Sequence, residues 1–390
     1  MEDARLRTLA RRLRDALRPA VRMLQTCRLT VSRLEGMGPV GPVCVLLASA
    51  GRAAEILAQQ AFQGEARRTE LGRVPLWLLA GFVKRNLGGV DLVIVQLDTL
   101  AAKLFRPNDC LCVPESLDVG LRVPDEIPSL LKSNHSLKDD MRIVRKNGLT
   151  MRISHDESDF EGFYEDSYVP FVNGRHGQDS VPRDKEWLRR QFREGAILWV
   201  MRGDQRLGGA VVSSGHGALH FWALATQDGD VRHMKEGAIA ALYLFVVEHA
   251  KAEGCSYVDF GRSRGFLGDN ILRYKRKWGM ELRAQGDLQS FLFVSWPQWN
   301  STVAAFLASA SVVHQDGADL AVVTATGLDV KAGQEDAERV LHRVAMDGLA
   351  RIVMVNESGW GEGVVVPPRV RLAGAKPKAG ELALLAQARG

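Results

Sequence analysis

The 390-residue chain is 46% hydrophobic and 25% charged, as ordinary globular proteins are, and its net charge of +5 permits a polyanionic partner without demanding one. Its five cysteines are odd in number and scattered, which argues against the disulfide framework of a small secreted protein. No apolar run approaches the roughly 18 residues that a membrane-spanning helix needs, so we expect a cytoplasmic protein with no integral membrane segment. The length of the chain is enough for two or three domains.

Residues 1–37 are predicted to form a basic N-terminal helical region. Leu6, Leu9, Leu13 and Leu17 recur at helical spacing over residues 4–18, with six arginines among them. Such a helix can contact membrane lipid or nucleic acid, and it can also dock on its own domain through the leucines. We favour docking, because charge on an exposed face is usually only solvated.

Residues 38–125 are predicted to form a small α/β unit. Gly and Pro make residues 38–42 a linker, because both residues interrupt regular periods. Apolar strands then alternate with helices, which is the pattern of an α/β unit. The strands are expected at Val43–Leu47, Asp91–Leu97 and Cys110–Val113, and the helices at Ala53–Phe62 and Leu76–Asn86.

Residues 126–297 are predicted to form one mixed α/β domain. It begins with a polar helix over 127–148 and includes a hairpin around Gly203-Asp204. Later it carries a helix from Gly237 to Glu253 and a strand that ends near Asp259. Residues 298–390 repeat the alternation weakly and form a C-terminal α/β extension. Its basic end is expected to be loosely ordered apart from a short helix over Glu381–Ala388.

The most informative pattern lies between Arg232 and Gly279. A cationic loop over Arg232–Ala238 opens a helix, and the strand ending at Asp259 leads into a loop rich in Gly and Arg. A further strand is expected to carry four cations within residues 273–277. Free backbone N–H groups at a helix start attract phosphates, so the arrangement suits an anionic acyl donor and points to acyl transfer.

These residues carry a resemblance to a known family. The order of elements in 126–297, with the Asp259-Phe-Gly strand end and the Tyr274-Lys-Arg-Lys-Trp-Gly279 segment, resembles the GNAT acetyltransferase fold. More narrowly, it is similar to the branch that includes the Fem peptidyltransferases and the acetyltransferases linked to exopolysaccharide synthesis. In that branch a helix ending in Ala-x-x-x-Gly, here Ala250 to Gly254, precedes the Asp-Phe-Gly strand. The resemblance implies two GNAT-like halves, the first degenerate.

The resemblance also implies where the donor, acyl-CoA, binds. GNAT donor loops follow a pattern like Arg/Gln-x-x-Gly-x-Gly/Ala, whose ends Arg232, Gly237 and Ala238 can fill. Lys235 and Glu236 occupy the middle of the pattern, and the segment is one residue longer than the pattern requires. Arg232 and Lys235 are therefore expected to act as point charges on the diphosphate. The long coiled-coil arm of many Fem proteins is absent, which weakens the case for tRNA as donor.

The resemblance further assigns catalytic roles. Lys275 is placed to stabilise the oxyanion of acyl transfer, where a fixed donor is worth on the order of 3 kcal/mol, and Tyr274 is placed to shape the acyl pocket. Alternatively, Lys275 is only one of several cations that form a solvated edge of a strand. Asp259 can act as a general base or orient the acceptor amine. It can also simply accept backbone N–H groups of the following loop, which we favour.

The acceptor side is less defined. Arg175 and His176 lie in a predicted turn and can meet the acceptor, as can Arg262, although each can also be surface charge. No metal is expected, because Cys110-x-Cys112 has no second ligand pair at zinc spacing.

The sequence therefore predicts a mixed α/β enzyme, an N-acyltransferase of the GNAT family. It would move an acyl group, expected to be acetyl, from acyl-CoA to an amine of a sugar, amino acid or small metabolite. Two alternatives stay open: an aminoacyl-tRNA-dependent Fem-like transferase, and a non-enzymatic degenerate GNAT fold that acts as a binding module. The oligomeric state is not predicted.

Overall fold

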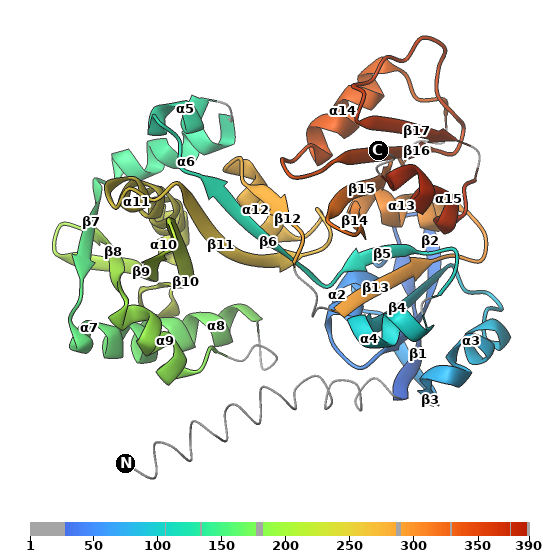
Figure 1. Ribbon diagram of the computed structural model, residues 1–390, viewed down its shortest axis with the longest axis horizontal. Coiled ribbons are helices and arrows are strands. Elements are labelled where there is room, and N and C mark those ends of the chain that lie inside the picture. The colour runs from blue at the N-terminus through green and yellow to red at the C-terminus, as the bar shows by residue number, and fades with distance from the viewer. Residues whose placement is uncertain are drawn as a thin grey trace. The chain divides into compact units, whose positions relative to one another are not determined.

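The computed structural model describes residues 28–105, 107–132, 135–176, 182–285, 290–327, 330–374 and 376–387. They form two compact units of mixed helices and strands, which confirms the predicted fold class (Figure 1). The first unit comprises residues up to 117, 263–273 and 283–390, and the second comprises 118–262 and 274–282. The helix predicted over residues 4–18 lies outside the described residues. No helix in the described part of the chain is long and apolar enough to span a bilayer.

The first unit contains a six-stranded sheet in the order β3-β1-β2-β4-β13-β5. Its strands are β1 (Arg28–Gly38), β2 (Gly41–Ser49), β3 (Arg67–Pro75), β4 (Leu92–Asp98), β5 (Leu111–Pro114) and β13 (Ser290–Ser295). β1 and β2 pair up to Gly38 and Gly41, so the predicted linker is a hairpin turn. The sequence analysis missed β1 because Leu29, Val31 and Leu34 fit both the strand and the helix period.

Helices cover both faces of this sheet. α2 (Ala53–Gln59) packs on one face, where its Leu57 joins Val45 and Ile94 in the core. α3 (Leu76–Arg85) and α4 (Thr99–Phe105) pack on the other face with Leu46 and Val93. Alternate strand residues point to opposite faces, so each strand serves both cores.

The C-terminal residues add a four-stranded sheet, β14-β15-β16-β17, to the first unit. Its elements are β14 (Val312–Asp316), β15 (Asp319–Ala325), β16 (Arg351–Asn356), β17 (Val370–Gly374), α13 (Ser301–Ala310), α14 (Gln334–Val344) and α15 (Ala379–Ala386). The end of the chain is thus more ordered than expected, because Val370, Leu382 and Ala386 are buried.

The two units divide the chain differently from the predicted domains 38–125, 126–297 and 298–390. Residues 283–390 join the first unit, because β13 pairs with both β4 and β5 and Trp296 and Leu382 share its core. The predicted boundary at 125 lies close to the observed one at 117.

The second unit is built on a seven-stranded sheet, β12-β6-β11-β10-β9-β8-β7. Its strands are β6 (Ser116–Arg122), β7 (Leu149–Ser154), β8 (Gly195–Arg202), β9 (Gln205–Gly215), β10 (Ala218–Thr226), β11 (Tyr257–Arg264) and β12 (Glu281–Arg283). Strands β7 to β10 form an antiparallel meander, and β10 and β11 are parallel. α11 (Ala238–Ala252) connects β10 to β11, which makes a βαβ unit.

Helices also line both faces of the second sheet. α11 packs against β8, β9 and β10 with α6 (His135–Lys146) beside it, and α5 (Ile127–Lys132) precedes α6. The other face carries α7 (Glu157–Gly162), the π-helix η1 (Phe163–Tyr168), α8 (Val169–His176) and α9 (Lys185–Arg193). Within β10, Phe221 contacts Tyr243 of α11 and Trp222 contacts Trp187 of α9, so β10 serves both layers.

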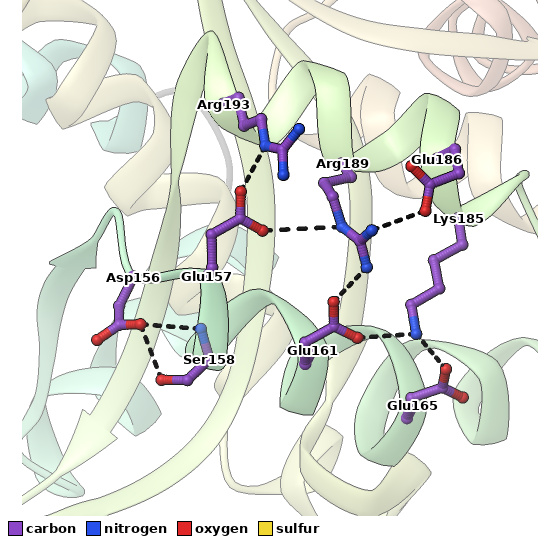
Figure 2. A network of polar contacts seen from close by, with 9 residues as sticks. All are labelled: Asp156, Glu157, Ser158, Glu161, Glu165, Lys185, Glu186, Arg189 and Arg193. Atoms are coloured by element: carbon purple, nitrogen blue, oxygen red, sulfur yellow. Dashed lines mark hydrogen bonds and ion pairs between the residues drawn. The ribbon is translucent and has the colours of Figure 1, made fainter. Parts of the chain in front are cut away.

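A ladder of ion pairs joins α9 to α7 and η1 (Figure 2). Glu157, Glu161 and Glu165 recur every four residues on one side, and Lys185, Arg189 and Arg193 recur at the same spacing on the other. Lys185 Nζ lies 2.8 Å from Glu161 and 2.5 Å from Glu165. Arg189 pairs with Glu161, and Arg193 pairs with Glu157. Residues four apart share a helix face, so the ladder holds α9 against the π-helix.

We expect Glu161→Gln to lower the melting temperature at neutral pH and to lose this effect in acid. The hydrogen bond from Lys185 holds the pKa of Glu161 below its ordinary value of 4.5. A carboxylate with a depressed pKa stabilises the fold above its unfolded pKa, and this contribution disappears as the pH falls through the folded value. Melting curves of both proteins across this range measure the effect.

The control is Glu194→Gln, which alters an exposed carboxylate at the end of α9. It should leave the melting temperature unchanged at every pH. A wild-type advantage over Glu161→Gln that stays constant into strong acid would contradict the role given to the ladder.

Candidate active site

The candidate site lies where the parallel strands β10 and β11 part. Their pairing covers Ala218 with Tyr257, Leu219 with Val258 and His220 with Asp259, and it ends there. β10 nevertheless continues to Thr226, and β11 continues to Arg264. In open α/β sheets, ligands bind beyond the carboxyl ends of parallel strands. The parting therefore opens the sheet on the side where α10 (Arg232–Lys235) and α11 begin (Figure 1).

The last paired residues bring a histidine and a carboxylate together. His220 Nδ1 lies 3.1 Å from Asp259 Oδ2, and both side chains are partly exposed. With the carboxylate as acceptor, Nδ1 carries the proton and Nε2 keeps its lone pair. No described residue forms a hydrogen bond with Nε2. The pair has the geometry of an oriented general base.

Asp259 performs a second task at the same point. Its Oδ1 accepts the N–H of Gly261 at 2.8 Å. Gly261 has a φ of 69°, a left-handed conformation that favours glycine. The structure thus gives Asp259 the turn contact that the sequence analysis favoured, and it adds the contact with His220.

An aromatic row extends from His220 toward α9. The imidazole stacks on Trp222 with ring centroids 5.0 Å apart, and Trp222 meets Trp187 edge-on at 5.3 Å. Trp222 Nε1 donates to Ser213 Oγ at 2.7 Å, which fixes the indole. Arg183 lies over the Trp187 ring. The row holds the His220 ring plane in place.

The N-terminus of α11 presents unpaired backbone donors. Gly237, with a φ of 95°, occupies the N-cap position, and its carbonyl accepts from Ala241. No hydrogen bond within the described residues uses the N–H groups of Ala238, Ile239 or Ala240. No side chain caps this helix start. A helix start with free N–H groups attracts anions, because the helix dipole adds positive potential there.

The predicted donor-loop cations have different surroundings. Arg232 is exposed and pairs with Asp230, and this contact lowers the pKa of Asp230 to about 2. Lys235 is exposed at the end of α10, a single helical turn where a flexible loop was predicted. Glu236 pairs with His233 and Arg202, which holds the pKa of Glu236 below its ordinary value. The acidic residues offset part of the expected positive charge.

Lys275 is buried, with 3% of its surface exposed. Its Nζ donates to the carbonyl oxygens of Phe260 at 2.7 Å and of Gly261 and Arg262 at 3.1 Å each. The left-handed Gly261 turns three consecutive carbonyls toward one ammonium. These contacts stabilise the course of β11 just beyond Asp259, which is a positioning role. They do not bring Lys275 and Arg232 to a shared ligand.

The segment that carries Lys275 is a helix, α12 (Asn270–Lys277), and the predicted strand is wrong. Asp269 begins it, because its Oδ1 accepts the N–H groups of Ile271 and Leu272 at 3.0 Å each. Tyr274 lies one residue before Lys275, with its ring edge-on to Tyr243 of α11 at 5.1 Å. Burial raises the pKa of Tyr274 above its ordinary value. Tyr274 is therefore part of an aromatic cluster beside β11.

The structure describes the side chain of only one of the three predicted acceptor residues, Arg262. Arg262 is largely exposed, with its Nε 3.7 Å from Asp118. The backbone of Arg175 and His176 forms the last residues of α8, and the side chains of both lie outside the described part of the structure. Their contact with an acceptor stays a prediction. Among the described residues, no group of three or more His, Cys, Asp or Glu is placed to hold a metal ion.

His220 is the functional candidate that the sequence analysis missed. From the sequence alone, His220 is only the first residue of an apolar run, His220–Ala225, that predicts a strand. A histidine within an apolar strand is the one sequence feature that could have indicated this residue. Its contact with Asp259, 39 residues away in the chain, forms only when the two strands pair.

Residues 134–276 match the family model described as an acetyltransferase (GNAT) domain. These residues are therefore similar to a GNAT acetyltransferase domain. This match confirms the predicted resemblance to the GNAT superfamily. It lies outside residues 38–125, so the GNAT-like origin of that region stays a prediction. A comparison with curated protein sequences gave no match.

Several solved structures match parts of the chain at low sequence identity. L-PGS from Bacillus licheniformis is 11% identical with a TM-score of 0.36, and the match covers 67% of this chain and 83% of that one. FemX is 12% identical with a TM-score of 0.35, over 67% and 84%. A GCN5-related N-acetyltransferase from Sphaerobacter thermophilus is 15% identical with a TM-score of 0.31, over 64% and 72%. TM-scores this low support no conclusion about activity.

We expect Lys275→Met to destabilise the protein by about 3 kcal/mol or more, because it leaves three carbonyls without their charged donor. Urea unfolding of the wild type and the variant measures the loss. The matched control is Arg273→Met, an exposed cation of the same helix, which should change stability by less than about 0.5 kcal/mol. Equal unfolding of both variants would remove the positioning role from Lys275.

Proposed function

We propose that the GNAT domain transfers an acyl group, with acetyl expected, from acyl-CoA to an amine of a sugar, amino acid or small metabolite. The observation that carries this proposal is the pairing of two features in one βαβ unit. One is the uncapped start of α11, and the other is the His220–Asp259 pair where β10 and β11 part.

The start of α11 suits the diphosphate of the donor. The N–H groups of Ala238, Ile239 and Ala240 form no hydrogen bond within the described residues, and the helix dipole adds to their attraction for phosphate oxygens. Ile239 is partly exposed, whereas Ala238 and Ala240 are buried, so a diphosphate must approach on the side of Ile239. Arg232 and Lys235 lie just before them in the chain and can supply point charges. The carboxylates of Asp230 and Glu236 lie in the same segment, so backbone donors carry more of the binding than the sequence suggested.

The dimensions suit a long, thin donor. Thr226, at the end of β10, lies six residues beyond His220, about 20 Å along a strand at roughly 3.3 Å per residue. The connection to α11 starts there. A donor held by its diphosphate at the helix start can extend between the parted strands and present its thioester near His220.

The chemistry requires a base. At neutral pH an amine acceptor is mostly protonated and must lose a proton before its nitrogen attacks the thioester carbon. His220 Nε2 accepts this proton, while Asp259 holds the ring and stabilises the imidazolium that forms. The tetrahedral intermediate then loses a second proton from its nitrogen and expels the CoA thiolate, which takes up this second proton. Lys275 acts indirectly, by fixing the strand that carries Asp259.

We expect His220→Gln to lower turnover at least about a hundredfold with little change in the binding of acetyl-CoA. The measurement is release of free CoA thiol from acetyl-CoA with a panel of amino sugars and amino acids. His342→Gln changes an exposed histidine of α14 and serves as the control. A fully active His220→Gln enzyme would exclude this residue as the base.

We also expect acetyl-CoA to bind at least about tenfold more tightly than S-acetylpantetheine, which keeps the thioester but lacks the diphosphate. Isothermal titration calorimetry measures both. Lys235→Glu should reduce the difference, because it places a negative charge before the helix start. Equal affinity for the two ligands would mean that the start of α11 does not hold the diphosphate.

A second candidate, an aminoacyl-tRNA donor, draws support from α6. Its exposed side carries Lys138, Arg142, Arg145 and Lys146, and α6 packs beside α11. This donor predicts activity that RNase abolishes and that falls steeply with salt. The non-enzymatic alternative predicts no heat of binding with acetyl-CoA, so the same titration separates it from the first proposal.

A further inference from the structure

The outer surfaces of α3 and α4 carry large apolar side chains in solvent. Trp77 is 65% exposed, Leu78 55%, Leu100 40% and Leu104 68%. The two helices contact one another and cover the same face of the sheet. We call these four residues the outer patch. Scattered single apolar residues on a surface are ordinary, but a group on neighbouring helices marks an interaction site.

Burial in the unit's own core does not explain the outer patch. α3 already buries Leu76 and Leu79, and α4 already buries Ala101 and Ala102. Each helix therefore has its inward apolar stripe, and the outer patch is a second apolar surface on the opposite side. A helix that only covers a core has polar residues there.

The charged residues within α3 and α4 are all basic. Neither helix contains an Asp or Glu, and their charged residues are Lys84, Arg85 and Lys103, all exposed. Arg73, exposed at the end of β3, adds a fourth cation just before α3. A Trp and leucines among Lys and Arg suit a surface with an apolar interior and an anionic layer above it.

We propose that the outer patch docks on an anionic phospholipid surface. Trp77 then sits at the level of the headgroups, and Leu78, Leu100 and Leu104 reach the acyl chains. Lys84, Arg85 and Lys103 keep their charges among the phosphates. This docking is independent of the acyl-transfer proposal.

The test is co-sedimentation of the full chain with vesicles. We expect binding to vesicles of phosphatidylglycerol and phosphatidylcholine, at least about tenfold weaker binding to phosphatidylcholine alone, and a steep loss with salt. Trp77→Ser combined with Leu104→Ser should weaken binding to the anionic vesicles at least about tenfold. Lys84→Glu, which alters charge alone, should weaken it several-fold.

The matched control is Val365→Ser, which removes an apolar side chain that is 75% exposed on a loop between β16 and β17. It should bind as the wild type does, and melting curves should show that all variants are folded. The proposal is overturned if the wild type does not sediment with anionic vesicles or if the outer-patch variant binds equally well. It is also overturned if sedimentation equilibrium without lipid shows a dimer that Trp77→Ser dissociates, because the patch then joins two copies of the chain.

Discussion

The candidate site depends on the parting of β10 and β11 directly after His220 and Asp259. Parallel strands normally continue to exchange hydrogen bonds, so their separation must be stabilised by other partners for the freed backbone groups. Here the ammonium of Lys275 binds three carbonyls of β11, and the carboxylate of Asp259 binds the N–H of Gly261. The interactions that hold the strands apart thus involve the residue that also orients His220. Structural stability and site geometry share the same few atoms.

Much of the fold around this site could be predicted from the sequence, because it is local. The start of α11 follows from Gly237 and the apolar run after it, and the strand with Asp259 follows from its alternating apolar residues. The positions of α2, α3 and β4 agree with the predicted elements to within a few residues, since each is an apolar segment bounded by polar residues or by Gly and Pro.

The remaining features depend on contacts between distant residues. The cations of 273–277 fit a strand by alternation, and only the cap at Asp269 and the burial of Lys275 make the segment a helix. Lysine is normally exposed, so nothing in the sequence indicated that three carbonyls surround this one. His220 became a candidate only when β10 paired with β11. Asp259, by contrast, is a candidate from the sequence alone, because a carboxylate follows a short apolar run there.

The position of β13 in the first sheet has a consequence for how this protein is made. The chain completes β1 to β5 early, then produces the whole region 118–262, and only afterwards supplies residues 290–295. During synthesis on the ribosome, β4 and β5 therefore lack the strand that joins them, and β4 presents an open edge. Synthesis of the first unit therefore starts before that of the GNAT region and ends after it, and the GNAT region can fold in between. Premature termination after the GNAT region would leave a nascent chain with an unprotected sheet edge, a substrate for chaperones and proteases.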